Sequence, residues 1–568
     1  MFTSSSHFLT TTSIVQGTFV ALITIILYKI IKYLIFLSKF KGLPQEKTNF
    51  IFGDLHQFVM RSSWKTFSPF ISKSAIKSKS TPLRDTTEYF ISRRKRAKSG
   101  IGVLWLGWYP VVWCLDHKTA QVILSSRHHI NKGLFYKIIA PFMKDGLITS
   151  KGDKWRNRRR LIGPAFNTTI ISQFIPLMIN NASMLVKSFR EASSSSKRAV
   201  NIVDYIHLTS MDIICKTAMG ISPEAQSKPS SLVVQAVTWM TKELAHRIYN
   251  PFLWVDLIFV KSPMGQSFRR HLQNFEHFTH SIIHSKLKLL RDKSTIELEK
   301  ADQKDSCNYD ANNNVNNVDE SCYYKEMTGE RKAFLDLLLE KHLQPSANDG
   351  KPIIDLEGVQ EEISTFLFAG YETTGTAIMW IIYLLGLHTE VQDKIHAEIN
   401  SILDDNIDDL SYNQIHKFNY LDQCIKEGLR LFPPVPMIAR ELDQEVILDG
   451  FKIPRGASVA IMIYSIHRDP IIYPDPDSFN PDRFDSDHIS SIPAYAYIPF
   501  SAGPRVCIGQ RFALIEMKII LIQIIKNFRL ISTKPLNQIP YEFEVTIRPK
   551  VPLDVNFIPR NSNCDDVL

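Results

Sequence analysis

The first long apolar run of the chain lies between residues 14 and 37. Residues 14–28 read IVQGTFVALITIILY, and YLIFL follows after the short segment KIIK. A helix over both pieces contains about 24 residues and is roughly 36 Å long, which is enough to cross a bilayer. The run is too long for a cleaved signal peptide, and no basic segment precedes it. The pattern therefore predicts a single-pass transmembrane anchor over residues 13–38, after a lumenal N-terminus of residues 1–12.

The charges near the end of this run predict its orientation. Lysines occur at Lys29, Lys32, Lys39 and Lys41, whereas none precedes the run. Basic residues that flank a membrane helix tend to stay on the cytoplasmic side. We therefore expect the bulk of the chain to face the cytoplasm. A hinge over residues 39–60 should follow the anchor, because it contains a proline that cannot continue a helix.

The rest of the chain shows mainly helical patterns, with strand patterns near its beginning and after residue 440. Residues 61–98 are polar and basic, and residues 102–115 (GVLWLGWYPVVWCL) predict a β-hairpin around a Tyr-Pro turn. Helical patterns dominate up to about residue 430, short strands return over residues 440–465, and a last helix is expected at residues 510–527. This order predicts a mostly α fold with small β-sheets.

We find no internal repeat in this region. We therefore expect a single large domain over residues 61–558, followed by a tail of residues 559–568. The low-complexity stretch DANNNVNNVDES lies within residues 300–325. It is too polar to build a core and is interpreted as an Asn-rich surface loop.

Composition narrows the classes of function. The 568 residues are 44% hydrophobic, and 67 basic against 57 acidic residues give a formal charge of +10. A net positive charge of this size is compatible with binding to nucleic acid, to an anionic membrane surface or to an acidic partner protein. The basic run SRRKRAKSG ends at residue 100, some fifty residues after the predicted anchor, so lipid headgroups are favoured and no nucleic-acid partner is expected.

The cysteines argue against a disulfide framework. They number seven and show no CxxC pairing: Cys114, Cys215, Cys307, Cys322, Cys424, Cys507 and Cys564. Reduced thiols in a cytosol-facing body are therefore expected.

One cysteine has an unusual setting, the stretch FSAGPRVCIG at residues 500–509. Gly503 and Gly509 allow a flat ligand to approach the backbone. Cys507 precedes a predicted helix, whose first amide groups favour a thiolate. Arg505 adds a positive charge and Phe500 would cover the sulfur from water. A thiolate nucleophile is the competing interpretation, but no histidine lies close in sequence to act as its base.

This stretch resembles the haem-binding signature of the cytochrome P450 superfamily, which keeps Phe, Gly, Arg, Cys and Gly at these positions. The resemblance implies the cytochrome P450 fold and makes Cys507 the axial thiolate ligand of the iron of haem b. The surrounding segments look most like the fourth P450 family and its relatives. Members of that family often carry a glutamate, which can become esterified to the haem, where this chain has Ala369. The haem should therefore be held noncovalently.

A second motif supports the resemblance. Residues 363–387 predict a long buried helix, yet its middle contains glycines and threonines, which are poor helix formers. A packing crossing or kink is one explanation. The segment AGYETT also resembles the oxygen-binding motif of the family. By that resemblance Gly370 would make room for O2, Thr373 would hydrogen-bond to it, and Glu372 would help to relay protons.

Further motifs follow the order of the family. KEGLRLFPPVPMIAR and the later FNPDRF resemble the ExxR helix and its partner segment, which implies that Glu427, Arg430 and Arg483 form a buried charge network. GDKWRNRRR resembles the WxxxR helix. The residues expected at the haem propionates are Trp155, Arg159 and Arg440.

The resemblance implies a membrane-bound monooxygenase that uses O2 to oxidise a small lipophilic substrate, such as a fatty acid or related lipid. NADPH-cytochrome P450 reductase would supply electrons, with cytochrome b5 as a further donor, and the endoplasmic reticulum membrane would be the site. A haem-thiolate isomerase or dehydratase and a non-catalytic haem sensor are the alternatives. An isomerase or dehydratase does not activate O2 and can do without the pair Glu372 and Thr373, so the presence of this pair argues against it. A haem sensor would share Cys507 but would not need the oxygen-binding groove.

Overall fold

The computed structural model of the chain describes residues 5–45, 54, 99–196, 199–230, 232–302, 332–345, 350–403 and 410–560. The predicted basic region at 61–98, most of the Asn-rich loop and nearly all of the predicted tail lie outside these residues. The hinge at 39–60 is described only in part.

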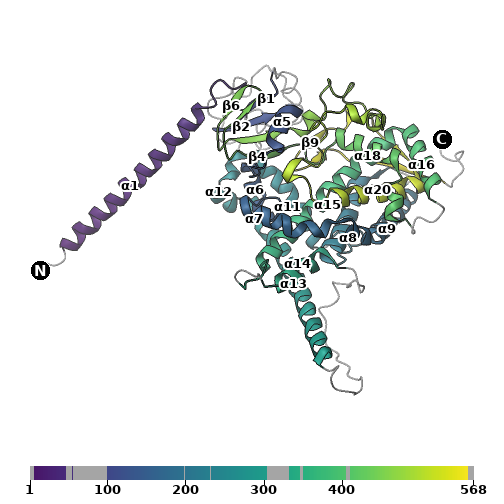
Figure 1. Cartoon of the computed structure of the whole chain (residues 1–568), viewed down its shortest axis with the longest axis horizontal. Coiled ribbons are helices and arrows are strands. Elements are labelled where there is room, and N and C mark those ends of the chain that lie inside the picture. The colour runs from purple at the N-terminus through teal and green to yellow at the C-terminus, as the bar shows by residue number, and fades with distance from the viewer. Residues whose placement is uncertain are drawn as a thin grey trace.

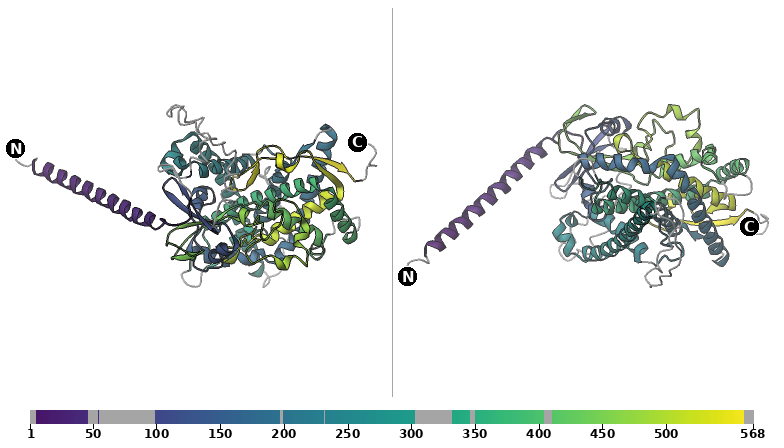
Figure 2. Two further views of the ribbon diagram at one scale, coloured as in Figure 1. Left: turned by 90° about the horizontal axis from the view of Figure 1, so that it is seen from above. Right: turned by 60° about the horizontal axis from the view of Figure 1, so that its bottom comes forward.

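The N-terminal helix α1 (Ser5–Ser38) projects away from the rest of the molecule (Figures 1 and 2). Its C-terminal end is tied to the body, because Tyr33 donates a hydrogen bond to the carbonyl of Trp108 at 2.9 Å and Phe40 is fully buried. Among the residues with a described placement, no helix has both the length and the apolar content that a membrane crossing requires. The predicted anchor over residues 13–38 is therefore not confirmed.

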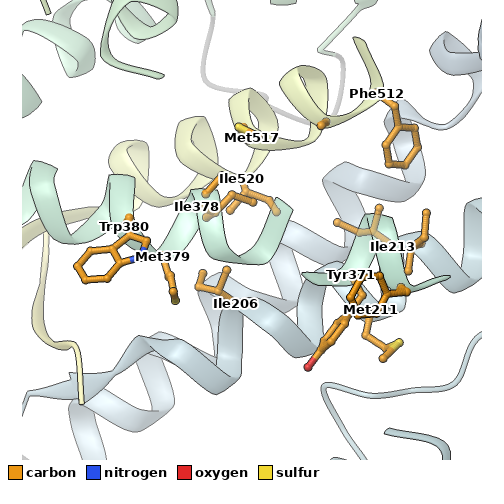
Figure 3. Packing of buried hydrophobic residues seen from close by; sticks show 14 of the residues in the cluster. Ile206, Met211, Ile213, Tyr371, Ile378, Met379, Trp380, Phe512, Met517 and Ile520 are labelled. Carbon is orange, nitrogen blue, oxygen red and sulfur yellow. The ribbon is translucent and has the colours of Figure 1, made fainter. Parts of the chain in front are cut away.

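Helix α15 (Leu356–Leu387) forms the centre of the body, and most of its side chains are buried. It packs against α10 (Ile202–Ile214), α18 (Asn419–Leu431) and α20 (Gln510–Asn527). Figure 3 shows Ile378 and Trp380 of α15 among Ile206 of α10 and Ile520 of α20. The apolar stretch that predicted a buried helix is thus the core around which the other helices lie.

The body contains further α-helices. They are α5 (His117–Leu124), α6 (Leu134–Met143), α7 (Gly152–Ile162), α8 (Thr168–Gln173), α9 (Ile175–Ser196), α11 (Leu232–Tyr249), α12 (Asp256–Lys261), α13 (Pro263–Asp302), α14 (Phe334–Leu343), α16 (Thr389–Ile402), α17 (Tyr412–Ile415) and α19 (Ile463–Ile466).

The largest sheet has the strand order β1-β2-β7-β4. Its strands are β1 (Ile101–Leu106), β2 (Tyr109–Cys114), β4 (Ile438–Glu441) and β7 (Ser458–Ile461). The hairpin between β1 and β2 is confirmed, but its turn lies at Gly107 and Trp108, where Gly107 has a φ of +62°. The predicted Tyr-Pro turn was wrong, because Tyr109 and Pro110 pair with Leu106 and Trp105 inside the ladder.

Three smaller sheets complete the described fold. They comprise β3-β11-β8 (Val200–Asn201, Asp554–Pro559 and Phe528–Ser532), β5-β6 (Val446–Leu448 and Phe451–Ile453) and β9-β10 (Tyr541–Phe543 and Ile547–Pro549). The mostly helical class with small sheets is confirmed, and α20 has the bounds that the sequence predicted. The strands that follow α20 were not predicted.

A close contact between α15 and α18 makes a testable prediction. A Cβ atom added at Gly428 would lie 2.5 Å from Cγ1 of Ile381. Gly428→Ala should therefore destabilise the protein by about 1–3 kcal/mol through overpacking. The same change should cost much less in an Ile381→Ala background, because the contacts are shared. Thermal unfolding of the single and double variants measures this coupling.

Gly163→Ala is the matched control, since no atom lies within 4 Å of its added Cβ. We expect this variant to be as stable as the wild type or slightly more so. An equal cost of Gly428→Ala in both backgrounds would contradict the contact.

Candidate active site

The loop before α20 presents Cys507 to a cavity. The Cys507 amide donates a hydrogen bond to the carbonyl of Phe500 at 2.9 Å, which closes the loop. Gly503 has a φ of +69°, and a Cβ atom there would lie 1.8 Å from the carbonyl oxygen of Leu124. Only glycine fits this position without moving the backbone. Helix α20 then begins directly after Gly509.

The cavity has a volume of about 380 Å³ and a mainly apolar lining. Cys507, Phe500 and Gly509 line it from the loop, and Gly370 and Thr373 line it from α15. The two motifs that the sequence singled out, some 130 residues apart, therefore meet at one site.

The environment of Cys507 alone does not favour a thiolate. Burial raises the pKa of its thiol, although the backbone N–H of Gly509 and the charge of Arg159 act in the opposite direction. A metal ion bound to the sulfur would overcome this cost, because a coordinating thiol is deprotonated outright. Burial also raises the pKa of Cys114, Cys215 and Cys424, but these three cysteines are buried and do not line the cavity, whereas Cys507 is exposed to it. Among the described cysteines, Cys507 is therefore the one that is placed to act as a metal ligand.

A group of cations lies along the same cavity or behind its wall: Lys132, Arg159, Arg440 and Arg505. Burial, and then the charges of Arg440 and Arg505, lower the pKa of Lys132 well below its usual range. Burial and the charge of Arg440 lower the pKa of Arg505 to about 9. Within the described part of the chain, the electrostatic neighbours of this group are its own members, Tyr136 and Cys507, with no carboxylate among them.

Lys132 and Arg440 are buried, and Arg159 and Arg505 are partly buried, so a nearby anion would offset the repulsion among these four charges. Haem carries two propionate groups, and the cation group offers charge-assisted hydrogen bonds to such carboxylates. The residues present therefore fit the cofactor that the sequence motifs imply.

Arg505 also has a structural contact set. It donates hydrogen bonds to the carbonyls of Ile130, Leu147 and Ser150 at 2.9, 3.1 and 2.5 Å. Its guanidinium lies 4.2 Å from the ring centroid of Trp155. The Arg505 guanidinium thus lies over the Trp155 ring as a cation–π pair. The predicted propionate contacts of Trp155, Arg159 and Arg440 stay predictions.

Thr373 and Gly370 lie in the cavity wall as the motif suggested. The Thr373 hydroxyl donates to the carbonyl of Ala369 at 2.7 Å. A Cβ atom at Gly370 would lie 2.5 Å from Cδ1 of Ile214. The absence of a side chain at Gly370 therefore also allows α10 to pack closely against α15. Ala369 lines the cavity as well, and its methyl group cannot form an ester.

Glu372 is fully buried and is not part of the cavity lining. Arg548 donates to both of its carboxylate oxygens, at 2.9 and 2.5 Å, and the Thr546 hydroxyl donates to Oε1 at 2.5 Å. Burial favours the neutral acid, but Arg548 and His207 outweigh it and lower the pKa of Glu372. Its predicted part in proton relay stays a prediction, and its carboxylate is held by an ion pair that the sequence did not reveal.

The structure brings Glu427, Arg430 and Arg483 together. Glu427 and Arg430 are completely buried and form a bidentate pair with two distances of 2.7 Å. Nε of Arg483 lies 3.4 Å from Oε1 of Glu427. Arg430 also donates to the carbonyls of His467, Pro476 and Ser478. This network joins α18 to the segment that precedes the cysteine loop.

Sequence reasoning missed Lys132, Glu544, Thr546 and Arg548. Lys132 is a single lysine without a pattern around it, and the other three belong to the β9–β10 hairpin, whose strands have three residues each. Strands this short carry no readable alternation.

Comparison with known proteins agrees with these motifs. A family model described as Cytochrome P450 matches residues 85–557. The chain is 34% identical over 460 residues to "Cytochrome P450 4V2" from Homo sapiens, covering 81% of this chain and 82% of the relative. It is 33% identical over 466 residues to "Cytochrome P450 4c3" from Drosophila melanogaster, covering 81% and 82%. It is 34% identical over 453 residues to "Cytochrome P450 4d2" from the same fly, covering 78% and 84%.

The Glu372–Arg548 pair predicts a large stability effect. Arg548→Met should leave a buried carboxylate without its main partner and destabilise the protein by about 3–5 kcal/mol. The control Lys452→Met removes an exposed cation that lies 4.0 Å from Glu445, and it should cost less than about 1 kcal/mol. Chemical unfolding of both variants tests the difference. Equal losses would show that Arg548 is no more important than a surface lysine.

The neutral state of His467 predicts a pH effect. Nε2 of His467 accepts a hydrogen bond from the Ile498 amide at 2.8 Å, and burial with the charges of Arg430 and Arg468 lowers the pKa of His467 to about 3. Below pH about 6.5 the unfolded chain binds a proton here that the folded protein does not. This site should therefore reduce the free energy of unfolding by about 1.4 kcal/mol for each pH unit below that value.

His467→Gln keeps an acceptor for Ile498 but removes the titration. The stability gap between wild type and variant should narrow as the pH falls from 6.5 towards 4, as measured by unfolding at a series of pH values. His416→Gln, at an exposed site, should leave the slope unchanged. Parallel curves for the wild type and His467→Gln would contradict the assignment.

Proposed function

The chain belongs to the cytochrome P450 family, and on that premise we propose that it is a haem-thiolate monooxygenase that inserts one oxygen atom of O2 into a small lipophilic substrate. The observation that carries the proposal is the presence of Cys507 and Thr373 in the lining of one mainly apolar cavity beside a buried cation group. A disulfide or a structural thiol would need none of these surroundings.

In this proposal Cys507 would hold the iron through its sulfur. Arg159, Arg440, Arg505 and Lys132 would bind the negatively charged side groups of the cofactor. Haem ligated by a thiolate supplies the activation of O2 and the cleavage of the O–O bond. The apolar wall of the cavity excludes water and positions the lipophilic substrate.

Thr373 and Glu372 would manage protons. The Thr373 hydroxyl donates its proton to the Ala369 carbonyl, so its oxygen is left to accept a hydrogen bond from the cavity side. Of the hydrogen-bond partners of Glu372 among the described residues, Thr546 belongs to the cavity lining, and its hydroxyl donates to the carboxylate. Because the pKa of Glu372 is lowered, the carboxylate would first have to accept a proton, and a proton passed on to the cavity would travel by way of Thr546.

Several finer assignments belong to the same proposal. A separate NADPH-cytochrome P450 reductase, with cytochrome b5 as a further donor, would supply the electrons. Contact with the endoplasmic reticulum membrane would use α1, whose apolar side chains between Val20 and Ile35 are largely exposed. With α1 in the membrane, the lysines within and after this segment would favour a cytoplasmic position of the catalytic domain. Fatty acids and related lipids are the first substrates to test.

The decisive experiment compares the purified haem-loaded protein with Cys507→Ser. The wild type, reduced and treated with carbon monoxide, should give the red-shifted absorption band of thiolate-ligated haem, and the variant should lose it. Cys564→Ser should keep the band. A Cys507→Ser variant that retains the band would refute the assignment.

Substrate class is tested with the same wild-type sample. Fatty acids, sterols and terpenoids are screened for spectral shifts and then for products with added reductase, NADPH and O2. A product that needs both NADPH and O2 is expected. Turnover without NADPH would point to an isomerase or dehydratase instead, and the lack of any substrate-dependent NADPH consumption would point to a sensor.

A further inference from the structure

The chain segment between α6 and α7 is bound from two directions. Arg505, which belongs to the cysteine loop, donates hydrogen bonds to the carbonyls of Leu147 and Ser150 at 3.1 and 2.5 Å. The Leu147 amide in turn donates to Oε2 of Glu362 in α15 at 3.1 Å. The main chain of Leu147 therefore links the middle helix of the fold to the loop that carries Cys507.

The carboxyl group of Glu362 is fully buried, so bulk water does not compete for it. Nη1 of Arg158 in α7 lies 3.9 Å from its Oε1. Burial is the main cause that raises the pKa of Glu362 to about 7, and Arg158 and the Leu147 amide oppose this rise. A neutral carboxyl group still accepts a hydrogen bond at its carbonyl oxygen. The contact with Leu147 therefore does not depend on the charge of Glu362.

The same segment fits closely against α15 at two further positions. A Cβ atom added at Gly146 would lie 2.6 Å from the carbonyl oxygen of Glu361 and would also clash with Oγ1 of Thr365. The Thr365 hydroxyl donates to the carbonyl of Met143 at 3.4 Å. Residues 143–147 are thus held against the first half of α15, and the Glu362 carboxyl group makes the shortest of these hydrogen bonds.

Loss of the Glu362 contact would be felt at the cysteine loop. The Leu147 amide would be left buried without its acceptor, which is unfavourable, so the segment would shift towards another partner. The Leu147 and Ser150 carbonyls that bind Arg505 would shift with it. Arg505 precedes Cys507 by two residues, so a looser hold on its guanidinium would also loosen the position of the sulfur.

We propose that Glu362 is a positioning residue, which holds the cysteine loop through the main chain of Leu147 and so helps to keep the Cys507 sulfur on the haem iron. The inference rests on the proposed function, because it concerns the iron ligand of that cavity. Glu362 is not part of the cavity lining, whereas Gly370, about two helical turns later in α15, is. It therefore acts on the site through Leu147 and Arg505.

The experiment separates the reach of the Glu362 side chain from its charge. Glu362→Asp keeps the charge but withdraws the carboxylate from the Leu147 amide by about one C–C bond, roughly 1.5 Å. Glu362→Gln removes the charge but keeps a carbonyl oxygen in reach of that amide. The haem-loaded full chain is reduced and treated with carbon monoxide, and the decay of the red-shifted thiolate band is followed at a temperature well below unfolding.

We expect the thiolate band of Glu362→Asp to decay about tenfold faster than that of the wild type, the effect of one good hydrogen bond. Glu362→Gln should stay within about threefold of the wild type, because its amide oxygen replaces the lost acceptor. Glu357→Asp is the matched control. It makes the same change at an exposed position in the first turn of α15 and should behave as the wild type.

A second control separates this effect from a general loss of stability. Phe557 in β11 stacks on Phe189 in α9, with ring centroids 4.1 Å apart. Phe557→Leu should lower the unfolding temperature through lost core packing, yet it should change the decay of the thiolate band by less than about twofold. An acceleration in Phe557→Leu equal to that in Glu362→Asp would reduce the role of Glu362 to stability and overturn the inference.

Three other results decide the question. Faster decay in Glu362→Gln than in Glu362→Asp would show that the charge matters and the hydrogen bond to Leu147 does not, which overturns the inference, and so would a wild-type rate in Glu362→Asp. If Glu362→Asp fails to retain haem while Glu362→Gln retains it, the inference is supported; loss of haem from Glu362→Gln overturns it. Failure of the proposed function looks different, since the wild type itself would then lack the thiolate band.

Discussion

The constraint on which this structure depends is the fixed position of one sulfur atom, that of Cys507, in the wall of a mainly apolar cavity. Burial raises the pKa of the Cys507 thiol, and one backbone amide and Arg159 only partly oppose it. The loop that carries Cys507 can close only with glycine at position 503. Cations that repel each other lie close to the same cavity. Each feature is unfavourable alone. An iron ion at the sulfur and the two carboxylates of a haem beside the cations would offset both costs.

Neighbouring residues of helix α15 have contacts in two different places. Gly370 and Thr373 belong to the cavity wall, whereas Glu372, between them in sequence, lies in a buried ion pair with the β9–β10 hairpin. Because successive helical positions differ by about 100° in direction, neighbours in a motif can act in different places. The motif therefore combines a lining function with a structural one, and the hairpin that contributes Thr546 to the cavity wall depends on it.

The sequence predicted those parts that have long or strongly restricted patterns. The buried helix around residues 363–387, the helix at 510–527 and the first hairpin all follow from runs of apolar residues or from alternation. The position of the hairpin turn was wrong, because a Tyr-Pro pair is compatible with both a turn and a strand. The Glu372–Arg548 pair joins residues 176 positions apart through three-residue strands, and no local pattern encodes such a contact. Lys132 is invisible for the same reason, since only the folded chain places it beside Arg440 and Arg505.

Arg505 binds the segment from residue 130 to residue 150 through three main-chain carbonyls and no side chain. Main-chain oxygens are present whatever the residue type, so this attachment places few demands on the identity of the amino acids that it holds. That segment also contributes Phe135, Ile139 and Met143 to the cavity wall. Substitution of these side chains would therefore change the shape of the cavity and leave the three hydrogen bonds of Arg505, and with them the attachment of the cysteine loop, in place.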